Sequence, residues 1–158
     1  MAIIIEAPNE VYSLKNHENI KLFLAGGITD CPDWQSTIIN NLIDEPNLTI
    51  YNPRRADFPI NDPNASEEQI TWEYNHLKEA DMIIYWFSKG SINPIVLYEL
   101  GKWGTSIDKP IYIGIDKDYT RSVDVEIQTK LANPHTKIVY SLDELSEIVK
   151  EKLLIKTN

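Results

Sequence analysis

The chain has little of what a secreted or membrane-anchored protein needs. It contains one cysteine, Cys31, so no disulfide can form within it. The N-terminal apolar run AIII is too short for the core of a signal peptide or for a membrane span. Positive charge is also scarce, since 15 basic side chains stand against 24 acidic ones and the net charge is −9. These absences predict a cytoplasmic protein that binds neither a nucleic-acid polymer nor an anionic membrane.

Patterns that bind metals and cofactors are missing as well. The three histidines, His17, His76 and His135, are scattered, and one cysteine does not complete a metal-ligand pattern with them. The glycine-containing segment AGGIT lacks the full G-x-G-x-x-G fingerprint of dinucleotide sites, and no serine lies in a G-x-S-x-G elbow. We therefore expect no metal, no cofactor and no serine-hydrolase triad.

What is present is the composition of an ordinary globular domain. The 158 residues are 42% hydrophobic and 25% charged, which suits one domain with one core. Brief β-branched and aromatic runs, typical of buried strands, alternate with segments of helical period. We expect strands at 20–25, 48–52, 81–87, 110–115 and 137–141, and helices at 32–44, 66–80, 94–108, 122–132 and 142–154.

This alternation predicts an α/β fold of the doubly wound, Rossmann-like or flavodoxin-like kind. Its sheet would have five parallel strands with helices on both faces. Residues 1–19 fit the pattern less well, and we interpret them as an N-terminal arm with a candidate edge strand at 3–5. Residues 20–158 then form a single domain.

Ligands of such sheets bind beyond the carboxyl ends of the strands, and two of the loops there carry suggestive residues. Gly26 and Gly27 follow the first strand, where they would let a ligand approach the backbone or merely form a tight turn. Arg54 and Arg55 follow the second strand. Their forked donors suit a phosphate or carboxylate, although surface ion pairs with nearby acids are an equal alternative.

The segment SINPIVLYELG predicts a helix that starts with Asn93 as its N-cap and Pro94 at its first position. Glu99 lies beside the apolar stripe of this helix. It either pairs with Lys102 at i+3 or acts as a partly buried functional carboxylate. Glu73 lies on the preceding helix. Two carboxylates near one cleft are what glycosidic-bond chemistry needs, but many proteins have such a pair without that chemistry.

The segments LFLAGGIT, YNPRR, WEYNHLKEADMIIYWF and NPIVLYELGKWGTSIDKPIYIGI together resemble the nucleoside 2-deoxyribosyltransferase-like family, from about residue 21 to 130. In that family a glutamate on the helix after the third strand attacks C1′ of a 2′-deoxynucleoside. Another base then captures the glycosyl-enzyme. The resemblance assigns the attacking role to Glu99 and the second catalytic carboxylate to Glu73, where typical members have aspartate.

The resemblance also implies a set of substrate contacts. It places Phe23 and the two glycines of AGGIT against the substrate, and Asn93 where typical members carry an aspartate that holds the sugar. Family members borrow a polar side chain from a neighbouring subunit, for which Asp124 is the best match here. A homo-oligomer that binds a nucleoside or nucleotide and a free base is therefore expected.

Two other functions stay open at this point. Relatives of the family hydrolyse N-glycosides, some of them nucleoside 5′-monophosphates, and Arg54 and Arg55 would then bind the phosphate. The third alternative is a nucleotide-binding module without turnover. Asparagine at position 93 favours it, and the intact Glu73 and Glu99 pair opposes it.

Overall fold

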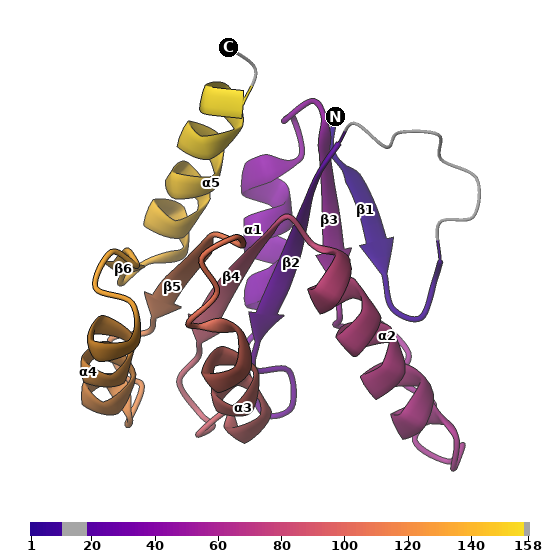
Figure 1. The fold of residues 1–158 in the computed structure, drawn as a ribbon. Coiled ribbons are helices and arrows are strands. Elements are labelled where there is room, and N and C mark those ends of the chain that lie inside the picture. Colours follow the sequence, from indigo (N-terminus) through magenta and orange to yellow (C-terminus); the bar gives the residue numbers. More distant parts are fainter. Residues whose placement is uncertain (11–18, 157–158) are drawn as a thin grey trace.

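The computed structural model describes residues 1–10 and 19–156. Strands and helices alternate along nearly the whole of this range (Figure 1). In chain order they are β1 (Ile3–Glu6), β2 (Ile20–Gly26), α1 (Trp34–Leu42), β3 (Leu48–Asn52), α2 (Ala65–Glu79), β4 (Met82–Phe87), α3 (Pro94–Trp103), β5 (Ile111–Ile115), α4 (Ser122–Ala132), β6 (Ile138–Val139) and α5 (Leu142–Lys156).

The strands form one parallel sheet in the order β1-β3-β2-β4-β5-β6. Six strands replace the five expected, because the candidate edge strand is real: Ile3 to Glu6 pair with Thr49 to Asn52 of β3. With four residues and one neighbouring strand, β1 shows only the short apolar run Ile3–Ile5, and the segments around it do not continue the pattern of the later strands. The rest of the N-terminal arm, residues 11–18, lies outside the described residues.

The order of the sheet fixes where a ligand site is expected. Strands β2 to β6 follow the flavodoxin-like order, in which the first strand lies between the second and the third. The chain therefore leaves β2 toward β3 on one side, whereas β4 lies on the other side. This divergence is the topological switch point, and it opens a crevice outside the carboxyl ends of β2 and β4.

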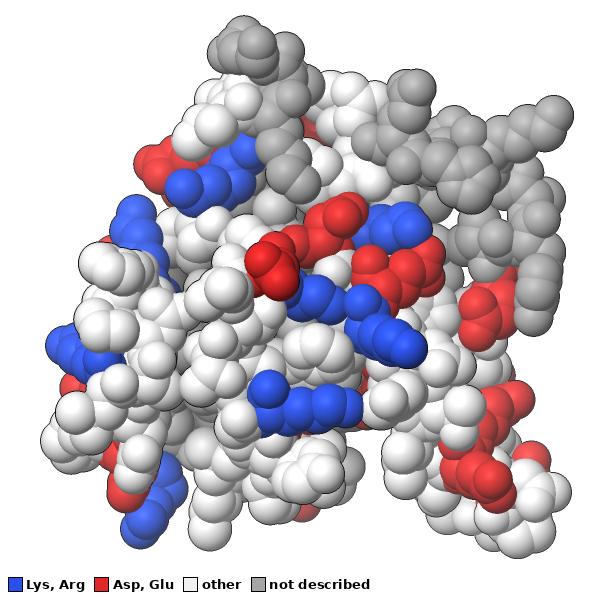
Figure 2. Space-filling model, viewed as in Figure 1, with Lys and Arg blue, Asp and Glu red and all other residues white. Residues whose placement is uncertain are grey.

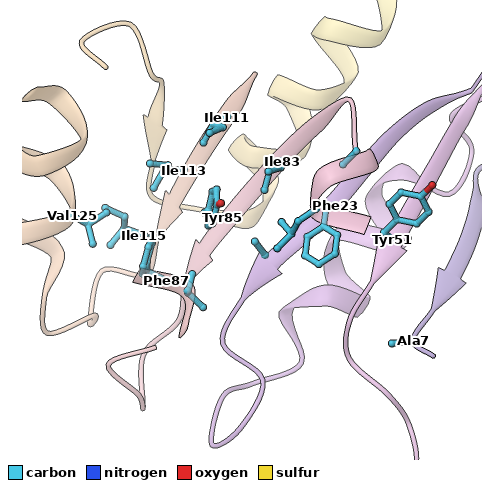
Figure 3. Packing of buried hydrophobic residues seen from close by; sticks show 14 of the residues in the cluster. Ala7, Phe23, Tyr51, Ile83, Tyr85, Phe87, Ile111, Ile113, Ile115 and Val125 are labelled. Atoms are coloured by element: carbon cyan, nitrogen blue, oxygen red, sulfur yellow. The ribbon is translucent and has the colours of Figure 1, made fainter. Parts of the chain in front are cut away.

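Two apolar layers hold helices to the two faces of the sheet. Helices α1 and α5 cover one face, and α2, α3 and α4 cover the other (Figure 1). The side chains of β4 alternate between the layers, as expected for a strand buried on both faces. Ile83, Tyr85 and Phe87 point into the α2–α3–α4 layer, part of which Figure 3 shows.

The boundaries of the helices and strands agree with the predicted ones within a few residues, with two differences. Helix α3 ends at Trp103 rather than at 108, since the chain turns at Gly104. Strand β6 spans only Ile138 and Val139 of the five residues expected. Within the described residues, none of the helices is both long and apolar enough to cross a membrane.

Candidate active site

A cleft of about 280 Å³ opens at the switch point, between the ends of β2 and β4 and the helices α2 and α3. It brings together residues that lie far apart in the sequence. Six of the predicted site residues line it: Phe23, Gly26, Gly27, Glu73, Asn93 and Glu99. Arg54, Arg55 and Asp124 are not among the lining residues.

The two carboxylates of the cleft come from neighbouring helices, Glu73 from α2 and Glu99 from α3. Burial raises the pKa of Glu99 to about 8, and the charge of Glu73 adds to this effect while that of Lys102 opposes it. Burial also raises the pKa of Glu73, against a hydrogen bond from Gln69 that lowers it. Two partly buried carboxyl groups that repel each other favour a state in which the pair keeps a proton near neutral pH.

Gln69 fixes the position of Glu73. Its Nε2 donates to Glu73 Oε1 at 2.7 Å and to the carbonyl oxygen of Pro53 at 2.8 Å. Glu73 is therefore tied to the loop between β3 and α2 as well as to its own helix. Gln69 is not among the residues predicted from the sequence, and the signal that points to it is its spacing of four residues from Glu73 on one helix.

The glycine loop after β2 needs glycine because Asn93 lies against it. A Cβ added to Gly27 would lie 1.8 Å from Asn93 Oδ1, which no side chain can tolerate. The indole Nε1 of Trp34 donates to the Gly27 carbonyl at 3.0 Å and ties the loop to α1. The loop therefore lines the cleft on one side, and Trp34 of α1 holds its backbone from the other side.

Asn93 does not make the N-cap hydrogen bond that the sequence predicted. Its backbone is left-handed, with φ of 55°, a conformation that asparagine tolerates better than most residues. The side chain turns back into the preceding loop, where Nδ2 donates to the carbonyl oxygens of Ser88 at 3.1 Å and Ser91 at 3.0 Å. Its Oδ1 accepts from Cys31 Sγ at 3.4 Å. Both amide hydrogens therefore hold the loop before α3.

Arg54 braces the glycine loop from outside the cleft. Its Nε donates to Gln35 Oε1 at 2.9 Å, and its guanidinium lies 3.4 Å from Asp33. The same guanidinium donates to three carbonyl oxygens of the loop, those of Ile28, Cys31 and Pro32. Arg54 thus bonds to the protein rather than facing the cleft.

Arg55 and Asp124 also have partners outside the cleft. Arg55 forms an ion pair with Glu68 at 3.1 Å and lies over the ring of Phe58. Asp124 lies on α4, where it pairs with Arg121 at 3.1 Å. It lines a second cavity, of about 390 Å³, between α3 and α4. A role for Asp124 in the cleft of a neighbouring subunit stays a prediction.

The other titratable groups of the described residues form no metal site, since they include no cluster of three or more side chains placed to hold an ion. Lys102, the expected ion-pair partner of Glu99, lies over the ring of Tyr74 at 4.2 Å from its centroid. Glu99 is therefore a partly buried carboxylate on the cleft wall.

The fold and the cleft define a doubly wound α/β protein with a cleft at its switch point. The family model described as nucleoside 2-deoxyribosyltransferase like matches residues 19–119, and the chain belongs to this family. Among solved structures, a conserved protein from Enterococcus faecalis V583 shares the fold. Its TM-score is 0.63 and its identity 16%, over 85% of this chain and 99% of that one. No curated protein matches the sequence significantly.

Proposed function

We propose that the protein transfers a 2-deoxyribosyl group between nucleobases by a retaining double displacement through an ester on Glu99. The observation that carries the proposal is that Glu73 and Glu99, from two helices, line one cleft beside the glycine loop. Membership of the nucleoside 2-deoxyribosyltransferase-like family supports the substrate class. A retaining displacement at an anomeric carbon also requires two carboxyl groups in one site.

In the first step, a carboxylate oxygen of Glu99 forms a bond to C1′ as the bond from C1′ to the base nitrogen breaks. The electron pair leaves with the base, which takes up a proton. Glu73 is the donor of that proton in this proposal. Burial raises its pKa, and the hydrogen bond from Gln69 holds its carboxyl group in position. In the second step, a nitrogen of the incoming base attacks C1′, the ester bond breaks, and a proton returns to Glu73.

The placement of the arginines favours a nucleoside over a nucleoside monophosphate as the substrate. Arg54 bonds to loop carbonyls and Arg55 to Glu68, so neither guanidinium faces the cleft as a phosphate ligand. The cleft volume of about 280 Å³ lies near the lower end of small-molecule pockets, which suits one nucleoside at a time. Transfer then requires the first base to leave before the second enters.

The test is to incubate the protein with a deoxynucleoside and a different free base, and to follow products and protein by mass spectrometry. Wild type should exchange the bases, and without an acceptor base it should gain the mass of a deoxyribosyl group on Glu99. Glu99→Gln and Glu99→Ala should lose both signals. Glu67→Gln, an exposed glutamate at the start of α2, is the matched control and should retain them.

Glu73→Gln separates the two carboxylates. It should slow departure of the base, most strongly for bases that must be protonated, and still allow labelling of Glu99 by an activated 2-fluoro sugar. Base exchange by Glu99→Ala at the wild-type rate would show that the proposed mechanism is wrong. A wild-type protein that releases the base into water without transfer would instead assign it to the hydrolases.

A further inference from the structure

The hydroxyl of Tyr85 is buried beneath the cleft wall without a hydrogen-bond partner among the described residues. Tyr85 lies in the middle of β4 and is fully buried. It projects into the same layer as Ile83, Ile113 and Ile115 (Figure 3). Native proteins pair nearly all such groups, since a buried polar atom without a partner is costly. An isolated hydroxyl in an apolar layer therefore indicates a partner that engages in another state of the site.

The charged group that acts on this hydroxyl is Glu99. Helix α3 covers the layer that contains Tyr85, and the two side chains are electrostatically coupled: burial raises the pKa of Tyr85, and the charge of Glu99 raises it further. Tyr85 thus keeps its proton, and its hydroxyl can donate a hydrogen bond. Among the hydrogen bonds of the described residues, none ends on the Glu99 carboxylate. In the part of the chain that the structure describes, Tyr85 thus has an unused donor and Glu99 an unused acceptor, and the two groups interact electrostatically.

We propose that Tyr85 is a positioning residue whose hydroxyl donates a hydrogen bond to Glu99 when that carboxylate is charged and aims its oxygen at the sugar. This inference rests on the proposed function, in which Glu99 is the nucleophile. The nucleophile must be an anion at the moment of attack. A hydrogen bond to the charged form stabilises that form and fixes the rotamer.

The other groups around Glu99 do not both stabilise its charged form and fix its rotamer. Glu73, from α2, carries the same charge and opposes ionisation of Glu99. Lys102, on α3 itself, favours ionisation, but its ammonium lies over the ring of Tyr74. On β2, Phe23 and Ala25 contribute no ionisable group to the cleft. Among the described residues, Tyr85 from β4 is the remaining titratable group coupled to Glu99, and it is an uncharged donor.

Tyr85→Phe tests the proposal because it removes only the hydroxyl. We expect kcat at neutral pH to fall about 10- to 100-fold, as for loss of a hydrogen bond to a charged group, with KM changed less than about twofold. The acid limb of the pH profile of kcat should move to higher pH, since the anion of Glu99 loses its donor. Thermal stability should be equal or higher, because a buried unpaired hydroxyl is removed.

Tyr112→Phe is the matched control. Tyr112 lies on β5, the strand next to β4, but belongs to the layer on the opposite face of the sheet. Removing its hydroxyl should leave kcat and the pH profile unchanged. Equal losses in the two variants, or no change in Tyr85→Phe, would overturn the proposal.

A titration separates this inference from the proposed function. The Glu99 carboxyl carbon, assigned by its absence in Glu99→Gln, is followed by ¹³C NMR against pH in wild type and Tyr85→Phe without substrate. A higher pKa in Tyr85→Phe supports the hydrogen bond even where no transfer is detected, and in that case only the proposed function fails. The same pKa in both proteins overturns the role of Tyr85 and leaves the proposed function standing.

Discussion

The side chain of Asn93 explains why this chain departs from the aspartate that typical relatives have. Its two amide hydrogens go to the carbonyl oxygens of Ser88 and Ser91, inside the loop before α3. A carboxylate has no hydrogen to give and would set a negative charge against two carbonyl oxygens. Asparagine is therefore required by this loop, and its presence no longer favours a binding module without turnover.

Asn93→Asp should thus destabilise the fold. Asn93 is 3% exposed. Two hydrogen bonds would be lost, and their carbonyl acceptors would have no donor. We expect the free energy of unfolding in urea at pH 7 to fall by about 2–4 kcal/mol. Asn64→Asp, at an exposed position whose side chain makes no capping bond, is the control and should change it by less than about 1 kcal/mol. Equal stability of Asn93→Asp and wild type would contradict this account.

Glu99 makes stability depend on pH with a definite sign. Its pKa rises from 4.5 to about 8 in the fold, so the folded chain holds this proton more tightly than the unfolded chain does. Ionisation of Glu99 therefore weakens the fold as the pH rises through that window. Glu99→Gln cannot ionise and should exceed wild type in stability at pH 9, by on the order of 2–3 kcal/mol.

The measurement is urea unfolding of both proteins at several pH values. The advantage of Glu99→Gln should shrink as the pH falls and vanish below the unfolded-state pKa of 4.5. Glu151→Gln, at an exposed position on α5, should follow wild type throughout. An advantage that grows toward acid pH would show that the Glu99 pKa is lowered rather than raised.

At the scale of elements, Arg54 connects the β3–α2 loop to the glycine loop after β2. Arg54→Ala would free three loop carbonyls, so amide hydrogen exchange in residues 27–33 should become faster. Because the loop lines the cleft, KM should rise about 3- to 30-fold, to the same extent for a nucleoside and its 5′-monophosphate.

Two further variants sharpen this test. Arg54→Lys keeps the positive charge but lacks the forked donors of the guanidinium group. It should therefore show a smaller rise in KM and in loop exchange than Arg54→Ala. Arg121→Ala, an exposed arginine paired with Asp124, should leave exchange in the loop unchanged. A far larger loss for the monophosphate than for the nucleoside would restore Arg54 as a phosphate ligand.

The helices and strands of this fold could be predicted well where apolar residues recur with a regular period along the sequence. Pro94 starts α3 as the sequence indicated, because this signal is local. Strand β1 had only a weak signal, since an edge strand is half-exposed and owes its place to pairing with β3. The turn at Gly104 that shortens α3 had no signal that we recognised.

The site could be predicted in part for a related reason. Glu99 stands out as a charge near an apolar stripe and Glu73 as a second carboxylate on the preceding helix, and the resemblance adds their roles. The hydroxyl of Tyr85 is one atom within the apolar run MIIYWF, and its lack of a partner appears only when α3 is packed on β4. In the same way, the turning of Arg54 away from the cleft depends on where the β2–α1 loop folds in space.

At the scale of the whole molecule, the outer surface of α3 and α4 is unusually apolar for a chain of net charge −9. Figure 2 shows that the surface over these two helices is largely uncharged in this view. Its exposed large side chains are Ile95, Tyr98, Val123, Ile127 and Leu131. Contiguous apolar surface of this kind marks interfaces. It also flanks Asp124, the residue that the resemblance assigns to a neighbouring cleft.

We therefore expect the protein to be a homo-oligomer that associates through α3 and α4. Sedimentation should give at least a dimer, and Leu131→Asp, with 76% of Leu131 exposed, should shift it toward the monomer without loss of secondary structure. Ile155→Asp, at a residue that is 66% exposed on α5, is the control and should leave the oligomer intact. Because a neighbour is expected to complete the cleft, activity on dilution should fall in step with the oligomer fraction. A wild-type monomer with full activity at the same concentration would contradict both the interface and the role of Asp124.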